Sequence, residues 1–463
     1  MERDLTSGNI TKTMLSFACP MILGNLLQQC YNIADTLIVG KFLGKEALAA
    51  VGSAYTLMTF LTSIIIGLCM GSGTVFSVCF GKNDRQQMKN SIAASFLFIA
   101  VVSAVINILA FANTDFILRI LHVPTDIYGI MREYVRIIFF GIFFTFLYNY
   151  FAFMLRAVGD SVVPLCFLGA AAALNIALDI LFVVVFNIGA GSAAAATVIA
   201  QAASGIGISA YVLFKKPELC PNRDNFKITK KTALEVIRHS CAACIQQSVM
   251  NFGILMIQGL VNSFGSTVIA AFGAAVKIDS FAYMPAQEFG NAFSIFISQN
   301  HGSRKPGRVS AGTRKAVIIS ASFCLAVSLL VFISAPYLMR IFVNASESGI
   351  IQNGVEYLRI EGSFYFAIGI LFLLYGFYRG IEKPEMSLIL TVISLGTRVL
   401  LAYLLAPIKT VGTRGIWWAV PIGWILADIT GLLCLRPIKA KQERTDKIKK
   451  PDKIELSSRR DRI

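Results

Sequence analysis

Residues 44–81 read GKEALAAVGSAYTLMTFLTSIIIGLCMGSGTVFSVCFG, an apolar run long enough to cross a bilayer as a helix. An offset of 221 residues places a similar run, residues 265–302, in register with it. The small residues then coincide, because Gly44, Ala49, Gly52, Ser77 and Gly81 fall on Gly265, Ala270, Gly273, Ser298 and Gly302. Two similar apolar halves in one chain are typical of transporters in which one half moves against the other around a central site.

The composition predicts an all-α integral membrane protein. Of the 463 residues, 56% are hydrophobic and 15% are charged, and the mean hydropathy is +0.68. These values lie outside the balance of soluble domains. The apolar runs predict twelve transmembrane helices: Met14–Val39, Leu48–Val78, Ser91–Ala112, Tyr134–Phe153, Val162–Phe186, Ala193–Phe214, Cys241–Phe264, Ala270–Ser298, Ala316–Ala335, Tyr357–Phe377, Met386–Ala406 and Ile416–Leu435.

The repeat predicts two pseudo-symmetric six-helix lobes. The later parts of the halves align at an offset of 223 residues, which places Arg156, Gly189 and Ala196 on Arg379, Gly412 and Ala419. The first lobe is expected to cover residues 1–214 and the second residues 239–435. A basic linker, residues 215–238, joins them, and a charged tail follows at residues 436–463.

The net charge of +16 predicts the orientation of the chain rather than a nucleic-acid partner. Most of the Lys and Arg residues fall in the termini and the even-numbered loops, so these are expected on the cytoplasmic face of a bacterial inner membrane. The basic tail has few aromatic side chains to stack on bases, which argues against nucleic acid binding. We expect a multi-pass protein with both ends in the cytoplasm and with the lipid bilayer as its surroundings.

Two acids deep in predicted spans are the strongest candidates for function, because an unpaired charge inside a bilayer is expensive. Asp35 in the first span follows Tyr31 and Gln28 at helical spacing, which makes a polar stripe. Asp179 in the fifth span lies one turn after Asn175. An amide beside a carboxylate either stabilises the anion or helps to form an oxygen cage for a small cation, whereas burial alone favours protonation.

The acids have no counterparts in the second half. The repeat offsets place Asp35 on Met256, Asn175 on Arg398 and Asp179 on Ala402, so ion coupling is expected in the first lobe. The role of Arg398 stays open between pairing with an acid, contacting an anionic group and bridging helices. Glu288 follows Pro285 in the eighth span, where it either contacts a cationic substrate or forms a structural charge network with Lys277 and Asp279.

At these positions the chain resembles the multidrug and toxic compound extrusion (MATE) antiporters, and more closely their bacterial DinF-like branch. The resemblance covers about residues 11–435 and is carried by Pro20–Ile22, Tyr31–Thr36, Gly40, Gly44, Ala49–Gly52, Arg156–Asp160, Asn175–Asp179 and Ala194–Gln201. It implies a V-shaped pair of six-helix lobes, a monomer, and export of organic cations in exchange for H⁺ or Na⁺. The first-lobe cation site of the family falls on Asp35, Asn175, Asp179 and Thr197, which would bind Na⁺ if the exchange is sodium-coupled.

The expected mechanism is competition between the coupling ion and a small organic cation for one negative cavity, with no other cofactor. We predict that Gln28, Tyr31, Asn32, Tyr148, Gln246, Glu288 and Arg398 line the substrate cavity. Aromatic wall candidates are Tyr31, Phe143, Tyr148, Phe153 and Phe289. The acids in the seventh and tenth spans that characterise another branch of the family are not matched, which leaves proton and sodium coupling both open.

Two other functions fit the architecture less well. A flippase for lipid-linked oligosaccharide precursors is the main alternative, but its cavity would need several basic residues for the diphosphate, and few lie deep in the spans. An integral membrane enzyme would need clustered acids or histidines, whereas Asp35 and Asp179 lie on separate helices. The chain is therefore not expected to be an enzyme.

Overall fold

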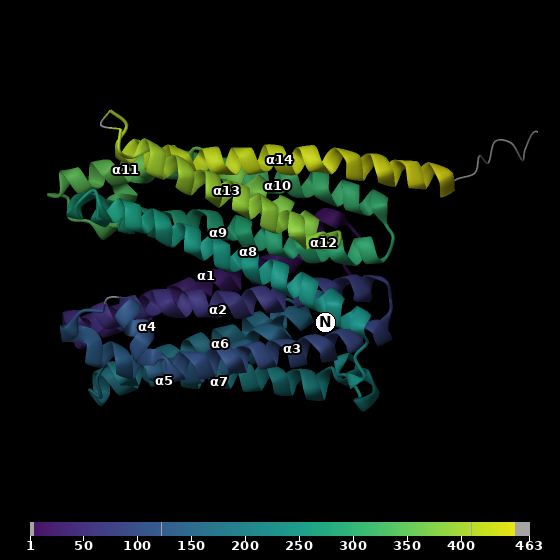
Figure 1. The fold of residues 1–463 in the computed structure, drawn as a ribbon, viewed down its shortest axis with the longest axis horizontal. Helices are drawn as coiled ribbons and strands as arrows, with labels where there is room; N and C mark the ends of the chain where they lie inside the picture. The colour runs from purple at the N-terminus through teal and green to yellow at the C-terminus, as the bar shows by residue number, and fades with distance from the viewer. Residues whose placement is uncertain (1–3, 122, 409, 450–463) are drawn as a thin grey trace, which may run out of the picture.

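The computed structural model describes residues 4–121, 123–408 and 410–449, and shows two helical lobes packed side by side (Figure 1). No strand occurs within these residues, which confirms the predicted all-α class. The helices run along the long axis of the molecule in both lobes. In Figure 1, α1 and α2 of the first lobe face α8 and α9 of the second.

The helices follow the order that the repeat predicts. The first lobe contains α1 (Ile10–Phe42), α2 (Gly44–Gly81), α3 (Arg85–Ala112), α4 (Thr114–Ile120), α5 (Thr125–Ala157), α6 (Val162–Asp179), a π-helix η1 (Ile180–Val185) and α7 (Ala190–Lys215). The short 3₁₀ turns η2 (Pro217–Leu219) and η3 (Arg223–Phe226) lie in the linker. The second lobe contains α8 (Lys230–Asn262), α9 (Ser266–Gly302), α10 (Pro306–Phe342), α11 (Ser348–Gly362), α12 (Tyr365–Gly380), α13 (Pro384–Leu405) and α14 (Thr413–Lys449).

The membrane spans agree with the twelve that the sequence predicts. Eleven stretches of the described residues are long and apolar enough to cross a bilayer, and α11 with α12 forms a twelfth that is bent by 51°. The predicted span Tyr357–Phe377 runs through this bend. Most helices extend beyond the predicted apolar spans, and the largest extensions include α14, which continues past Leu435 to Lys449, and α8, which begins at Lys230 inside the predicted linker. Residues 450–463 of the predicted tail lie outside the described residues.

Side-chain caps explain why the helices at one end of the bundle begin where they do. Asn9 accepts a hydrogen bond from Lys12 N at the start of α1, Asp84 does so from Gln87 N before α3, and Thr229 from Thr232 N before α8. Each cap satisfies a backbone donor that the first turn leaves without an intrahelical partner. Charged first turns can therefore continue as helix beyond the apolar span, which is why α8 starts earlier than its hydropathy predicts.

The first helix of each half packs in the hydrophobic cores of both lobes. Met14, Phe17 and Met21, at the start of α1, belong to the hydrophobic core of the second lobe, whereas Val39 near the end of α1 belongs to that of the first. The pattern repeats in α8, where Ala243 packs in the first-lobe core and Ile257 in that of the second. The predicted six-helix units are therefore joined by two helices that each contribute to both cores.

Glycines bring the lobes into backbone contact at the end of the bundle that carries the α2–α3 and α9–α10 turns, which we call the closed end. A Cβ on Gly71 of α2 would lie 2.6 Å from Ser240 Cα of α8, and a Cβ on Gly81 would lie 2.8 Å from Gln299 Cα of α9. Gly302, the repeat equivalent of Gly81, meets the backbone of Val78 in the same way. These distances leave no room for a side chain. The repeated glycines of the sequence therefore mark this helix crossing.

Polar contacts reinforce the closed end. Ser72 Oγ and Ser240 Oγ lie 2.8 Å apart, and Gln299, which is fully buried, donates to Ala157 O at 2.8 Å. The N-terminal segment crosses the junction, because Leu5 N donates to the same Gln299 side chain at 3.1 Å. The sequence predicts that this end is cytoplasmic.

An ion-pair cluster between the lobes at the closed end predicts a pH-dependent stability. Glu382 lies 3.4 Å from His301 Nε2 and 3.6 Å from Lys82 Nζ of the other lobe. The hydrogen bond from His301 and the charge of Lys82 lower the pKa of Glu382 to about 2, although partial burial opposes the shift. Because the pKa is lower in the folded than in the unfolded chain, the stabilisation is present above about pH 4.5 and is lost as the pH falls towards 2.

We therefore expect the melting temperature to fall more steeply between pH 5 and 3 in the wild type than in Glu382→Gln. The variant cannot take up the proton, so its melting temperature should be lower than that of the wild type at pH 6, and the difference between the two proteins should be smaller at pH 3. Thermal unfolding of purified protein over this pH range measures the difference. Identical pH profiles for the two proteins would contradict the role of Glu382.

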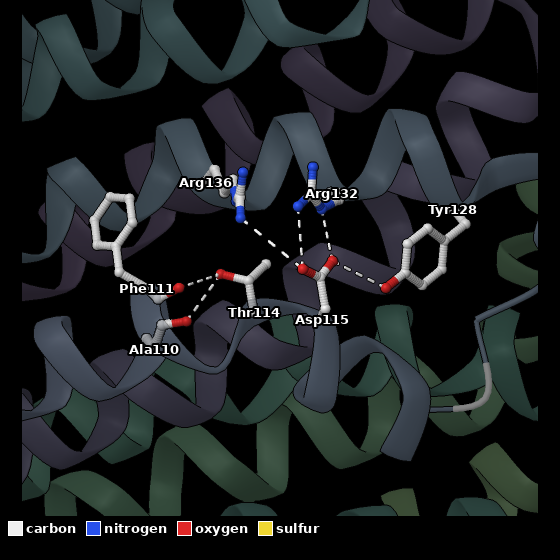
Figure 2. A network of polar contacts seen from close by, with 7 residues as sticks. All are labelled: Ala110, Phe111, Thr114, Asp115, Tyr128, Arg132 and Arg136. Carbon is white, nitrogen blue, oxygen red and sulfur yellow. Dashed lines mark hydrogen bonds and ion pairs between the residues drawn. The ribbon is translucent and has the colours of Figure 1, made fainter.

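The opposite end of the first lobe is held by a network around Asp115 of α4 (Figure 2). Arg132 of α5 donates from Nε and Nη2 to the two carboxylate oxygens at 2.6 and 3.0 Å, and Tyr128 OH donates to Oδ1 at 3.0 Å. Arg136 Nη2 lies 3.9 Å away. The hydrogen bonds from Arg132 lower the pKa of Asp115 to about 2. The bidentate geometry fixes the short α4, which has too few residues to be stable alone, against α5.

Candidate functional site

A cavity of about 430 Å³ lies between the lobes. Its walls come from α1, α2, α5, α6 and α7 of the first lobe and from α8 and α9 of the second. The contributing residues occupy the middle of each helix and the half that leads away from the closed end. Towards the closed end the cavity stops where Gly67 and Gly71 of α2 meet the backbone of α8. The cavity volume is in the range of sites that hold one drug-sized molecule.

The cavity wall carries many polar side chains, although apolar atoms make up the larger share of its exposed surface. Five tyrosines line it, and Asp35 is its one charged residue within the described chain. The largest group is ten carboxamide side chains: Asn25, Gln28, Gln29, Asn32, Asn149, Asn175, Gln201, Gln247, Asn251 and Gln287. The predicted aromatic wall is wrong in part, because Phe143, Phe153 and Phe289 do not line the cavity. Phe153 and Phe289 are buried in helix packing, and Phe143 is about half exposed on the outside of α5.

Asp35 and Asp179 form an acidic pair at the first-lobe side of the cavity. Their carboxyl groups are close enough to interact electrostatically, although they come from α1 and α6. Asp179 is fully buried, and no protein donor in the described residues lies within hydrogen-bonding distance of either of its carboxyl oxygens. Two adjacent acids without a donor or a basic partner need a proton or a cation between them, since their like charges repel in a low dielectric.

The helix changes its form at this acid. Asp179 is the last α-helical residue of α6, and the next six residues form the π-helix η1. A π-helical segment widens the backbone and is frequent at functional sites. Residue spacing alone gives no sign of this change, because the sequence Ile180–Val185 is a uniform aliphatic run.

Asn175, one helical turn before Asp179, and Thr197 add further oxygen atoms near the acidic pair. Asn175 Nδ2 donates to Thr197 Oγ1 at 3.4 Å, which turns the amide oxygen the other way, and no protein donor reaches that oxygen. Asn175 is 2% exposed, and both residues line the cavity. Carboxylate, amide and hydroxyl oxygens are the ligands that a hard cation such as Na⁺ prefers.

The structure places several predicted substrate residues in the cavity wall, namely Gln28, Tyr31, Asn32 and Tyr148. It does not place Gln246 there, because that side chain is 2% exposed within the helix packing and its neighbour Gln247 lines the cavity instead. The sequence offers two adjacent glutamines, and only the rotation of α8 decides which of them faces inwards.

Glu288 lies beside the cavity rather than in its wall. Its Oε1 accepts hydrogen bonds from Asn25 Nδ2 and Asn291 Nδ2, each at 3.3 Å. Arg379 donates to Asn291 Oδ1 at 3.0 Å, and the charges of Arg156 and Arg379 both act on Glu288. The charges of the two repeat-equivalent arginines, one from each lobe, thus act on the same carboxylate, and Asn291 bridges Arg379 to it. The predicted network with Lys277 and Asp279 is not formed around Glu288.

Arg398 is placed away from the cavity, in a second cluster that the sequence analysis missed. Its charge acts on Asp279 and Glu361, which are 4% and 1% exposed. Tyr365 OH donates to Asp279 Oδ1 at 2.6 Å and Tyr357 OH to Glu361 Oε2 at 2.8 Å. Buried acids therefore occur in the second lobe as well, at positions that are not repeat equivalents of Asp35 and Asp179. Glu361 lies near the start of a predicted span, whereas Asp279 lies well inside one, and the sequence analysis considered Asp279 only as a partner of Glu288.

Tyr134 is a further residue that the sequence analysis missed. It is 6% exposed, lines the cavity and interacts electrostatically with Asp35 and Asp179. The sequence places it at the edge of a predicted span. The helix α5 begins nine residues before Tyr134, at Thr125. An expectation that the helix extends beyond its apolar run would have placed Tyr134 inside the span.

Comparison with known proteins finds a matching family model and relatives that align along most of the chain. The family model MatE matches residues 20–181 and 242–404. A protein named "Probable multidrug resistance protein YpnP" from Bacillus subtilis (strain 168) is 31% identical over 395 residues, which cover 84% of this chain and 87% of that protein. "Probable multidrug resistance protein NorM" from Thermotoga maritima is 26% identical over 428 residues, which cover 91% and 90%.

The fold is also that of solved transporters. A structure described as "Outward-facing conformation of a multidrug resistance MATE family transporter of the MOP superfamily" superposes with a TM-score of 0.88 at 24% identity, covering 97% of this chain and 98% of that one. The family model falls on the two halves that the 221-residue repeat defines. The family model and these relatives show that the chain, with its twelve spans and central cavity, belongs to the MatE family of multi-pass membrane efflux transporters. The members of this family are transporters and not enzymes.

Proposed function

We propose that the protein is a secondary active antiporter that exports organic cations in exchange for H⁺ or Na⁺, with the coupling ion bound at Asp35 and Asp179. The observation that supports this most strongly is the acidic pair itself, whose buried carboxyl oxygens have no protein donor. An organic cation and a coupling ion both neutralise the same pair, so each weakens the binding of the other. That competition couples the two fluxes.

The state described here is the outward-facing one in this proposal. The lobes meet at the closed end, where a side chain on Gly71 or Gly81 would overlap the opposite backbone, and the cavity lies on the other side of these contacts. Inward opening then requires the lobes to separate at the closed end. The backbone contacts, the buried Gln299 and the Lys82–Glu382 pair make up the barrier between the cavity and the predicted cytoplasm.

The chemistry of the cavity favours a cationic substrate over a lipid-linked diphosphate. No Lys or Arg occurs among its described lining residues, and Asp35 contributes negative charge. A diphosphate would lose its hydration in such a site without gaining a cationic partner. The flippase alternative therefore has no supporting observation in the cavity.

The coupling ion can be identified by imposing one gradient at a time on reconstituted protein. Vesicles with a pH gradient but equal sodium, or with a sodium gradient but equal pH, are compared for uptake of a fluorescent organic cation. We expect one gradient to drive uptake against a concentration difference. Uptake at the same rate after both gradients are collapsed would contradict antiport.

Thr197→Val distinguishes the two ions further. Valine has the same shape but lacks the oxygen that a sodium site needs, so sodium coupling predicts an increase of about tenfold or more in the sodium concentration for half-maximal transport. Proton coupling predicts little change, because the carboxyl groups remain. Val198→Thr, which adds a hydroxyl at the adjacent position on α7, is the control for the local change in polarity.

A further inference from the structure

The second lobe contains a buried acidic pair that the transport mechanism proposed above does not use. Asp279 of α9 and Glu361 of α11, which we call the second-lobe pair, are 4% and 1% exposed, and neither lines the cavity. Their carboxyl groups are close enough to interact directly, although they come from separate helices. Two carboxylates in one buried site repel each other strongly when both are ionised, so such a pair titrates as a unit.

The protein supplies fewer hydrogen-bond donors than the second-lobe pair can accept. Tyr365 OH donates to Asp279 Oδ1 at 2.6 Å. Tyr357 OH lies 2.8 Å from Glu361 Oε2 and 3.5 Å from Asp279 Oδ2, but its one hydrogen serves only one of these oxygens at a time. Glu361 Oε1 is buried and receives no hydrogen bond from any described donor. A proton on one carboxyl group, donated to the other, supplies the missing hydrogen bond.

The charges around the second-lobe pair leave room for one proton. Arg398 of α13 is the basic group whose charge acts on both acids, and its Nε has no hydrogen-bond partner in the described chain. One guanidinium balances one carboxylate, so full ionisation of the pair would leave a second negative charge uncompensated. Burying such a charge within a membrane span is expensive. One bound proton removes it.

The other groups packed around the second-lobe pair do not alter this balance. They are tyrosines, which are neutral at physiological pH, and one tryptophan: Tyr283 of α9, Tyr357 of α11, Tyr365 of α12, and Trp417 of α14 against Tyr357. Lys277 is exposed on α9 and borders a surface pocket instead. Of these, Tyr283 lines the cavity, so the second-lobe pair lies behind the cavity wall rather than in it.

The second-lobe pair lies at the break between α11 and α12. The two helices meet at 51°, with α11 ending at Gly362 and α12 beginning at Tyr365. Glu361 precedes the break and Tyr365 follows it, and both interact with Asp279 of α9. Asp279 therefore connects α9 to both sides of the bend. The contact with α12 is a hydrogen bond from a neutral tyrosine, whereas the contact with α11 depends on the charge of two acids.

We propose that the second-lobe pair is a proton-binding site, separate from Asp35 and Asp179, and that its bound proton fixes the bend between α11 and α12. The proton joins the two carboxyl groups and leaves one negative charge for Arg398. When the proton leaves for the surrounding solution, two carboxylates face each other and α11 moves away from α9. Tyr365 keeps α12 in place, so the angle between the helices changes. In Figure 1, α11 lies at the end of the bundle away from the closed end.

Infrared spectroscopy of the purified protein at pH 7 tests for the shared proton, because a protonated carboxyl group absorbs apart from a carboxylate. We expect Glu361→Gln and Asp279→Asn each to lose the absorption of one protonated acid, since the acid that remains is ionised beside Arg398. The double variant should lose no more than either single variant. Retention of the full wild-type absorption in both single variants would overturn the proposal.

A distance measurement across the bend tests the second part. Gln352→Cys on α11 and Lys383→Cys after α12 place spin labels at two exposed positions of one lobe, in a chain whose ten native cysteines are replaced. The 16 residues of α12 span about 24 Å, so each 10° change in the bend moves its end by about 4 Å. We expect the wild-type distance to shift by about this amount between pH 6 and pH 10.

The controls separate the second-lobe pair from other buried acids. Glu361→Gln should keep the pH 6 distance at both pH values, because its amide donates to Asp279 as the shared proton does. Asp179→Asn and Asp428→Asn should shift like the wild type, since neither acid belongs to the second-lobe pair. A wild-type distance that does not change with pH, or an equal shift in Glu361→Gln, would overturn the proposal. Neither measurement uses an ion gradient, so both outcomes leave antiport untouched.

Discussion

Asp179→Asn is expected to abolish gradient-driven transport while the protein still inserts and folds. Asparagine has nearly the same volume as aspartate, but it cannot take up a proton or give its charge to a cation. The buried pair would retain only Asp35, so the competition between the coupling ion and the cargo would be lost. Accumulation of an organic cation in proteoliposomes under the driving gradient should fall to the level of empty vesicles, whereas size-exclusion profiles should match the wild type.

Asp428→Asn is the control for replacing a buried acid. Asp428 lies in α14, is 7% exposed and does not line the cavity, so its replacement should leave the coupling of transport unchanged. Undiminished transport by Asp179→Asn at normal protein levels would remove this acid from the mechanism. Loss of coupling in both variants would show that buried acids in general, rather than this pair, are needed. Asp279→Asn would then be the next variant to measure, because it tests the second-lobe cluster.

Gly71→Leu should have the largest effect on the folded state. Its Cβ would lie 2.6 Å from Ser240 Cα, and the rest of the leucine would point into the α2–α8 backbone contact. Overpacking of this kind typically costs about 1–3 kcal/mol, and here both neighbours are backbone that cannot rotate away. We expect a lower melting temperature in detergent and more frequent opening of the closed end. Ser77→Cys, made in a chain whose ten native cysteines are replaced by serine or alanine, would report that opening through its rate of reaction with a maleimide, because Ser77 is fully buried.

Gly52→Leu is the matched control on the same helix. Nothing lies within 4 Å of a Cβ at Gly52, so the same replacement should leave both the melting temperature and the maleimide reaction near the wild-type values. Equal destabilisation by the two variants would mean that helix flexibility, rather than the lobe contact, explains the effect of Gly71. Wild-type behaviour of Gly71→Leu would contradict the tight crossing.

Part of the site could be predicted because it depends on short-range spacing. The i, i+4 relation of Asn175 and Asp179 places both on one face of a helix whatever the rest of the chain does. Apolar length predicts the spans in the same way, since a bilayer demands about 20 residues per helix. The bend between α11 and α12 and the π-helix after Asp179 could not be predicted, because both depend on packing against other helices rather than on a local residue preference.

The choice of cavity-lining residues depends on helix rotation, which sequence spacing does not determine. Gln246 and Gln247 are neighbours, yet one is buried in packing and the other faces the cavity. Arg398 is the repeat equivalent of a cavity residue, Asn175, but its longer side chain interacts with Asp279 and Glu361 instead. Pseudo-symmetry of the backbone therefore does not extend to the roles of the side chains.

By itself the sequence determined the membrane class, the two-fold repeat, the number of spans and the acids of the first lobe. These follow from apolar length, internal similarity and the high cost of charge in lipid, which act locally along the chain. Only the tertiary structure decided that Asp35 and Asp179 meet, that α1 and α8 serve both cores, and that amides rather than phenylalanines face the cavity. The physical reason is that each of these depends on how one helix is rotated against a partner distant in the sequence, and close packing between helices selects that rotation.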